Sequence, residues 1–189
     1  KETLVNGADR VSINTAAIEN KKFIKEAVET FGSSTICISI ETLKINNKYK
    51  IFTDSGRTEI NTDTFDWIKE VQDLGVGEII LTSINNEGTG KGYDLNLYEK
   101  ASKISNISLL AHGGARNPSD VYEVFSKTGV DGAVIASAFH FNYYKELLEK
   151  KDIPLKGSTD FLKKNINQGI FFGINNLKEY LKTKKIEIR

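Results

Sequence analysis

The sequence predicts an α/β fold built on a parallel sheet, and three observations support this prediction. Five short runs rich in isoleucine, valine and leucine are almost continuous, as in strands that are buried on both faces. Amphipathic stretches typical of helices lie between them, and strand starts recur at intervals of about 25 to 43 residues, the period of a strand–helix unit. A glycine that closes a helix shortly before a strand recurs in LVNGADRVSIN, QDLGVGEIILT and SKTGVDGAVIA, which indicates repetition of that unit.

The elements follow from these patterns in chain order. The apolar runs are the expected parallel strands, at residues 10–14, 34–41, 77–84, 107–114 and 132–139. The amphipathic stretches are the expected helices, at residues 20–32, 62–75, 93–102, 117–129 and 174–184. Thr62 or Asp63 suits the N-cap of the second helix and Gly75 its end, while Pro118 suits the first turn of the fourth.

Two segments interrupt the repeat. Residues 44–62 alternate polar and apolar side chains, which predicts a hairpin-like excursion after the second strand. Residues 142–173 are irregular, and we interpret them as an inserted segment before the C-terminal helix. A strictly parallel repeat fits either a (β/α)8 TIM barrel or an open doubly wound sheet, and loops after strands carry the informative residues, as barrel enzymes require. Five strands are too few to close a barrel, so we expect residues 1–189 to form one partial-barrel domain.

The opening of the chain also favours a partial barrel. Leu4 and Val5 are typical of the last turn of a helix closed by Gly7, and the sequence contains no methionine. We therefore expect the chain to be a piece of a longer protein whose N-terminal portion is missing.

Composition argues against several function classes. The 26 basic and 25 acidic residues leave a formal charge of +1, so we expect no nucleic-acid and no membrane partner. No apolar run approaches the roughly 20 residues that span a bilayer. The single cysteine, Cys37, lies in an apolar strand, so we expect no disulfide and a cytoplasmic location. His112 and His140 are the only histidines and lack metal-ligand spacing, so we expect no metal and no cofactor.

Four loops that follow predicted strands suit a phosphate ligand. Glycines let the backbone approach a ligand closely, and backbone N–H groups with a helix N-terminus form phosphate sites in barrels. The four loops carry Asn14 and Thr15, Glu87 and Lys91, Gly113 and Gly114, and Ala136 and Ser137. His112 directly precedes the double glycine, within reach of a ligand.

One carboxylate, Glu41, ends the second predicted strand in the stretch ICISIETLK. At the C-terminal mouth of a barrel, an acid in that position is typical of a catalytic group. The alternative interpretation is a solvated strand end.

Three stretches in combination carry a family resemblance: GADRVSINTAA, GEIILTSI with the GT and GYD that follow it, and GGAR. With them the chain resembles the cyclase subunit of imidazole glycerol phosphate synthase, the HisF family, nearly colinearly over residues 1–141. The final NNLKEYLKTKKIEIR is similar to the last helix of that family. The resemblance implies strands four to eight of a (β/α)8 barrel, with the first three strands and the first catalytic aspartate absent.

The resemblance also implies roles, carried over by position. Glu41 falls at the second catalytic aspartate, the acid/base group on strand five. The two phosphate sites of the family substrate fall at Asn14 and Thr15, and at or beside Gly88, Gly114, Ala136 and Ser137. Arg10 and Glu78 fall at two charged residues that gate the entrance for ammonia, and Asp9 falls at a contact to the glutaminase (HisH-like) partner.

Departures from the family leave three functions open. Glu41 is one methylene longer than aspartate, His112 replaces a small polar residue, and the family's acidic loop reads NNEGT. The first function is a HisF-type lyase that uses ammonia from a glutaminase to cyclise a ribulosyl phosphate to imidazole glycerol phosphate in histidine biosynthesis. The second is a HisF-like paralogue that delivers ammonia to a sugar amidotransferase for surface polysaccharide, without cyclase activity. The third is a non-catalytic, phosphate-binding half-barrel.

Overall fold

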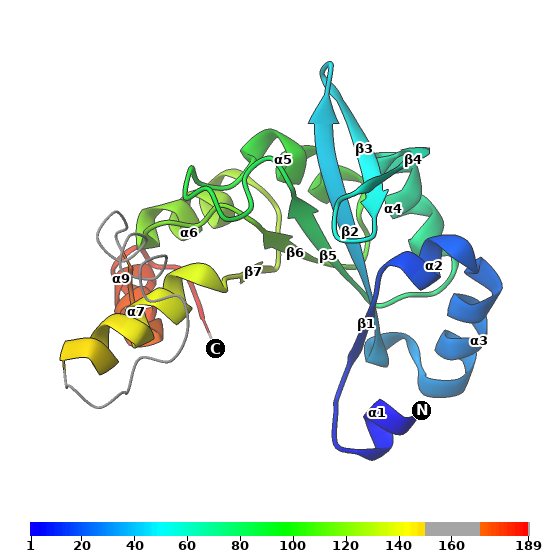
Figure 1. Ribbon diagram of the computed structural model, residues 1–189, viewed down its shortest axis with the longest axis horizontal. Helices are drawn as coiled ribbons and strands as arrows, with labels where there is room; N and C mark the ends of the chain where they lie inside the picture. The colour runs from blue at the N-terminus through cyan, green and yellow to red at the C-terminus, as the bar shows by residue number, and fades with distance from the viewer. Residues whose placement is uncertain (150–170, 189) are drawn as a thin grey trace.

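The computed structural model describes residues 1–149 and 171–188, which form an arc with one central sheet (Figure 1). The strands are β1 (Val11–Ile13), β2 (Ile36–Ile45), β3 (Lys48–Thr53), β4 (Thr58–Asp63), β5 (Glu78–Ser83), β6 (Ser108–His112) and β7 (Gly132–Val134). The helices are α1 (Glu2–Val5), α2 (Thr15–Glu19), α3 (Lys21–Phe31), η1 (Ser33–Thr35), α4 (Thr64–Asp73), α5 (Leu95–Ile104), α6 (Pro118–Lys127), α7 (Ser137–Glu149) and α9 (Ile174–Thr183).

The five predicted parallel strands pair in chain order, β1-β2-β5-β6-β7. The long strand β2 pairs with β5 along one edge, and its other edge is shared by β1 and then β3. β3 and β4 run antiparallel and form the predicted excursion. Among the described residues β1 and β7 do not pair with each other, so the sheet is open, as expected for a partial (β/α)8 barrel.

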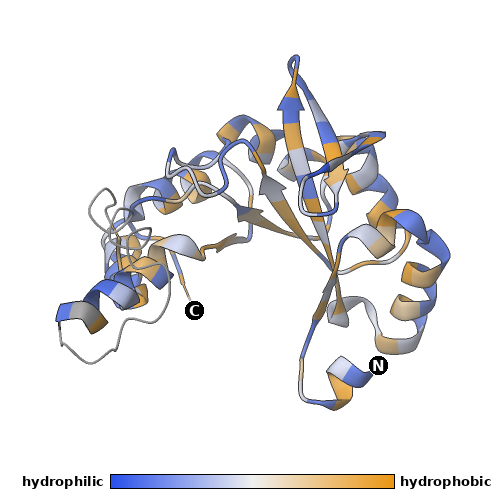
Figure 2. Cartoon of the chain, in the orientation of Figure 1, coloured by the Kyte–Doolittle hydropathy of each residue, from blue (hydrophilic) through white to orange (hydrophobic). Residues whose placement is uncertain are grey.

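Helices cover one face of this sheet. α4, α5 and α6 lie along the convex side of the arc, and Figure 2 shows apolar residues gathered on the strands and on the helix sides that meet them. The core there includes Ile38, Ile79, Leu81 and Leu109, which are at most 1 % exposed, and the indole of Trp67. Burying such a side chain contributes about 1.5–3 kcal/mol each, which is what fixes the helices to the sheet.

Side chains on the other face fall into three rows, because register aligns residues of neighbouring strands and alternate residues share a face. The row near the amino ends of the strands contains Ser12, Cys37, Glu78 and Ser108. The middle row contains Ser39, Ile80, Leu110 and Gly132. The row near the carboxyl ends contains Glu41, Thr82, His112 and Val134. Stacked layers of this kind fill the interior of (β/α)8 barrels.

Short polar side chains cap the starts of three helices, and the predicted cap of α4 is among them. The side chain of Asn20 accepts a hydrogen bond from Phe23 N, and Asp63 rather than Thr62 accepts from Phe65 N at the start of α4. Asn117 caps α6 with Pro118 in the first turn. Short polar side chains in these places satisfy amide groups that have no partner within the helix.

Three predictions need correction. The second strand does not end at Glu41 but continues to Ile45, because β3 extends its ladder and pairs Phe52 with Glu41. The last strand stops at Val134 instead of continuing to residue 139, since α7 begins at Ser137. α7 continues to residue 149, so the first part of the segment 142–173 is helical rather than irregular; residues 150–170 lie outside the described residues.

No helix in the described part of the chain is long and apolar enough to cross a bilayer.

Candidate functional site

A cavity of about 260 Å³ opens at the carboxyl ends of β5, β6 and β7. Its wall consists of the loop after β5, the loop after β6 and the start of α7. Five sequence-predicted residues from three separate loops line it: Gly88, Gly113, Gly114, Ala136 and Ser137. The structure therefore brings together residues that are up to 49 positions apart in the sequence.

The glycines allow two loops of the cavity wall to approach each other closely. Gly114 has φ +104°, and a Cβ there would lie 2.1 Å from the carbonyl oxygen of Gly92. Gly92 N donates a hydrogen bond to Gly114 O at 2.8 Å, and the side-chain amide of Asn86 donates to Gly92 O at 2.7 Å. Only glycine fits between these backbones, so the cavity wall depends on Gly114.

Two features of the cavity wall favour an anion. The 13-residue helix α7 begins at the cavity, and its first two residues, Ser137 and Ala138, line it. The free N–H groups and the dipole of a helix N-terminus favour an anion. Arg116, on the loop after β6, also lines the cavity. This combination suits a phosphate group.

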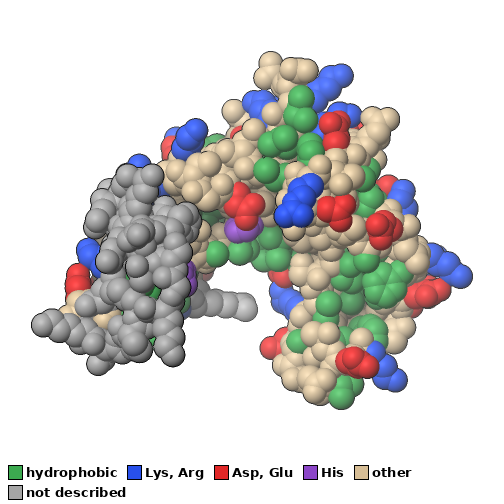
Figure 3. All heavy atoms as spheres, viewed as in Figure 1, with side chains coloured by type: hydrophobic (Ala, Val, Ile, Leu, Met, Phe, Trp, Pro, Cys, Tyr) green, Lys and Arg blue, Asp and Glu red, His purple; other side chains and the backbone are tan. Residues whose placement is uncertain are grey.

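Polar side chains of the row near the carboxyl ends lie next to the cavity. Thr82 Oγ1 and His112 Nδ1 are 3.0 Å apart, and His112 lines the cavity. Glu41 follows in the same row on β2, and its Oε2 is buried without a hydrogen-bond partner among the described residues. Figure 3 shows a histidine beside an acidic side chain at the hollow of this face.

The residues predicted for a second phosphate site lie away from this cavity. Asn14 and Thr15 follow β1, which pairs with β2, whereas the cavity lies at the ends of β5, β6 and β7. Asn14 Oδ1 is buried and has no partner in the described part of the chain, and Thr15 Oγ1 accepts a hydrogen bond from Asp54 N at 3.4 Å. Two buried acceptors, Asn14 Oδ1 and Glu41 Oε2, are thus left without donors among the described residues, and such groups are rare unless a ligand or water satisfies them.

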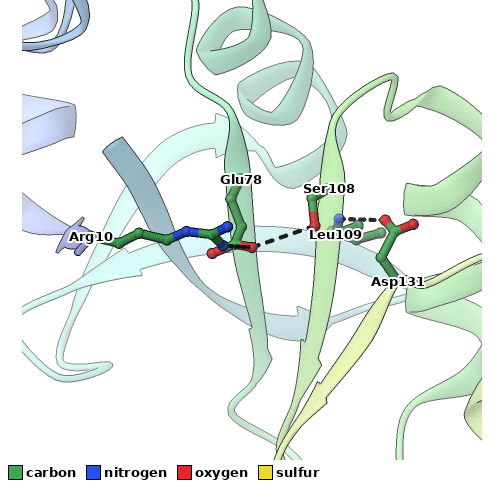
Figure 4. A network of polar contacts seen from close by, with 5 residues as sticks. All are labelled: Arg10, Glu78, Ser108, Leu109 and Asp131. Carbon is green, nitrogen blue, oxygen red and sulfur yellow. Dashed lines mark hydrogen bonds and ion pairs between the residues drawn. The ribbon is translucent and has the colours of Figure 1, made fainter. Parts of the chain in front are cut away.

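At the opposite, amino end of the strands, Arg10 and Glu78 form an ion pair of 2.6 Å (Figure 4). Ser108 Oγ also donates to Glu78 Oε2 at 3.5 Å. The hydrogen bond to Glu78 and the negative charge of its carboxylate raise the pKa of Arg10 above its usual value. Asp9 is exposed beside it.

Cys37 lies in the same row and is buried. Burial raises the pKa of its thiol to about 11, and the Glu78 carboxylate adds to the shift. A thiol that is neutral and inaccessible is unreactive. Residues 1–149 and 171–188 contain no cluster of three or more histidine, cysteine, aspartate and glutamate side chains that could hold a metal ion.

Sequence reasoning missed Thr82 and Arg116. Thr82 is a polar residue inside the apolar run GEIILTSI, which is a weak signal, and its contact with His112 depends on the register between β5 and β6. Arg116 follows the double glycine directly, but its place on the cavity wall depends on how two loops fold together.

The fold and the site define the class of protein: a parallel α/β chain of the (β/α)8-barrel class, with a small ligand cavity at the carboxyl ends of its strands. A family model described as "Histidine biosynthesis protein" matches residues 1–145, and the chain belongs to this family.

Curated relatives agree with that assignment. The chain is 47% identical over 137 residues to "Imidazole glycerol phosphate synthase subunit HisF" of Sulfurisphaera tokodaii, an alignment that covers 72% of this chain and 54% of that protein. It is 38% identical over 186 residues to the protein of the same name from Saccharolobus solfataricus, covering 98% of this chain and 63% of the relative. The chain is also 38% identical over 161 residues to the protein of the same name from Chlorobaculum parvum, covering 82% of this chain and 64% of the relative. The chain thus spans between about half and two thirds of the length of these relatives, and the resemblance seen in the sequence is confirmed.

Proposed function

We propose that this chain acts in the cyclase subunit of imidazole glycerol phosphate synthase, where β1, β2, β5, β6 and β7 are strands four to eight of the barrel. The reaction would be that of a lyase which uses ammonia from a glutaminase partner to cyclise a ribulosyl phosphate to imidazole glycerol phosphate in histidine biosynthesis. One observation carries the proposal: in a chain 47% identical to a HisF subunit over 137 residues, five predicted phosphate-binding residues line one cavity at the carboxyl ends of the strands.

The cavity would hold one phosphate of the substrate. A phosphate carries more hydrogen-bond acceptors than a single side chain can serve, so it needs several donors that converge. The amide groups at the start of α7, the hydroxyl of Ser137 and the glycine backbone at Gly113 and Gly114 provide such donors. The volume of about 260 Å³ accommodates a phosphate and the first carbon atoms attached to it.

Glu41 would be the acid/base group. Its carboxylate lies in the row that faces the open side of the sheet, between the cavity and Asn14. A buried carboxylate oxygen without a donor is unfavourable in the free protein, and an N–H or O–H group of the substrate would relieve that cost on binding. Asn14, with its own unpartnered oxygen, and Thr15 would contact the second phosphate, since an amide side chain can turn its NH₂ group toward an anion.

The glutaminase would contact the amino ends of the strands. Arg10 and Glu78 stand there, and the exposed Asp9 is beside them. The middle row, with Ser39, Ile80, Leu110 and Gly132, separates this charged pair from Glu41 with small and apolar side chains. Such a lining would let uncharged ammonia pass and would hinder ammonium. A biosynthetic enzyme of this kind would work in the cytoplasm.

Binding and turnover test the proposal together. Calorimetry should detect binding of the ribulosyl phosphate substrate, and substrate with an ammonium salt should yield imidazole glycerol phosphate in a protein that contains this chain. Glu41→Gln should bind the substrate and lose turnover by at least about 100-fold, since proton transfer by a placed group contributes about that much. Glu59→Gln, at an exposed position of β4, serves as the matched control and should retain activity. Absence of both binding and turnover in the unaltered protein would overturn the proposal.

A further inference from the structure

His112 is held firmly at the end of β6. Its backbone oxygen accepts a hydrogen bond from the hydroxyl of Tyr98 at 2.5 Å, and its Nδ1 meets Thr82 Oγ1 at 3.0 Å. Thr82 is 4 % exposed and Tyr98 is fully buried, so both contacts come from rigid surroundings. The second ring nitrogen, Nε2, has no hydrogen-bond partner in the described part of the chain, although the residue lines the cavity.

We propose that His112 binds the anion in this cavity through Nε2 and that its charge makes anion binding depend on pH. The inference rests on the proposed phosphate cavity and deepens it. It assigns the residue a role in selecting ligands by charge, because an imidazolium favours a doubly charged phosphate monoester over a neutral or singly charged group of similar size.

The Thr82 hydroxyl makes this assignment chemically consistent. When the imidazole is neutral, the hydroxyl donates to Nδ1, which leaves the ring proton on Nε2 as a donor. When the imidazole is charged, Nδ1–H donates to the hydroxyl oxygen, and Nε2–H remains a donor that now carries positive charge. In both states Nε2 carries a proton that it can donate to a ligand in the cavity, and only the charged state adds an ion pair to the hydrogen bond.

The other charged groups around the cavity set the sign of the effect. Arg116 on the loop after β6 is positive, and Glu87 on the loop after β5 is negative; both line the cavity. Glu41 is two strands away in the same row. The part of α7 that lines the cavity, Ser137, Ala138 and Phe141, carries no charge. An imidazolium attracts a bound dianion more strongly than a neutral imidazole does, so anion affinity should rise as pH falls through the range from about 5 to 8 in which histidines titrate.

Sulfate is the probe that isolates this effect, because it stays doubly charged across that range whereas phosphate gains a proton. Isothermal titration calorimetry should show sulfate binding at least about tenfold tighter at pH 6 than at pH 8, the size expected when one hydrogen bond becomes charge-assisted. His112→Gln, which keeps a neutral donor, should bind with the pH 8 affinity at both pH values. His140→Gln removes the other, exposed histidine, which does not line the cavity, and should behave as the unaltered chain.

Thr82→Val gives an independent check, since it leaves the imidazolium Nδ1–H without an acceptor and should weaken sulfate binding mainly at pH 6. Circular dichroism and urea unfolding would confirm that each variant is folded. If His112→Gln keeps the full pH dependence, this inference is wrong and the proposed phosphate cavity stands. If the unaltered chain binds neither sulfate nor phosphate at either pH, the cavity proposal and this inference both fail.

Discussion

Replacing Gly114 with alanine should separate the two loops that form the cavity wall. The added Cβ would lie 2.1 Å from Gly92 O, a backbone atom that cannot turn aside as a flexible side chain would. Relief of the overlap requires the loops to move apart, and that movement breaks the hydrogen bond of 2.8 Å from Gly92 N to Gly114 O. The substitution therefore acts on both stability and ligand binding.

The magnitude follows from two contributions. A side chain at φ +104° costs roughly 1–2 kcal/mol, because L-residues rarely adopt that conformation. Loss of the hydrogen bond between the loops adds about 1 kcal/mol. The free energy of unfolding should fall by about 2–3 kcal/mol, which corresponds to a decrease in Tm of about 4–12 °C for a chain of this size.

Gly7→Ala is the matched control for this measurement. Gly7 has a similar φ of +98°, and nothing lies within 4 Å of the position that its Cβ would take. It should show the conformational cost alone, about 1–2 kcal/mol in urea unfolding, and should leave phosphate affinity unchanged. Equal losses of stability in the two variants, with phosphate binding intact in Gly114→Ala, would refute the argument that close approach of the loops builds the cavity.

Three further predictions concern Glu41, Asp63 and Cys37. Glu41→Gln should raise the free energy of unfolding by about 1 kcal/mol in urea while turnover is lost, because a neutral amide is less costly to bury than a carboxylate oxygen without a partner; a loss of stability would contradict this. Asp63→Ala should cost about 1 kcal/mol by removing the cap that accepts from Phe65 N, and Asp63→Asn should restore most of it. The thiol of Cys37 has a pKa raised to about 11, so the folded state holds its proton longer than the unfolded state and stability should fall as pH rises from about 9 to 11. In the folded chain a thiol reagent at pH 8 should label Cys37 slowly, and rapid stoichiometric labelling would show that it is accessible.

Local features of the sequence were enough to predict most helices and the parallel strands. Apolar runs and capping interactions involve only a few neighbouring residues. Asn20, Asp63 and Asn117 therefore begin their helices independently of the rest of the fold. The errors occurred where strand pairing determines the boundary of an element. The strand was predicted to end at Glu41 because a charge follows an apolar run, yet pairing with Phe52 in the hairpin extends that strand to Ile45. The run from residue 132 onward contains no break between β7 and α7, so its local pattern could not separate strand from helix.

Pairing also explains why the candidate site could be only partly predicted. Glycines and small polar residues after strands mark ligand loops by composition, and five of the residues predicted in this way line the cavity. Which side chains share a row, in contrast, depends on register, and register placed Thr82 between His112 and Glu41. A slip of one residue between β5 and β6 would turn His112 toward the helices and leave Thr82 without its contact. The chemistry proposed for the carboxyl ends of the strands therefore depends on how β2, β5 and β6 align. Variants that disturb this alignment should abolish anion selectivity even where every side chain of the cavity is retained.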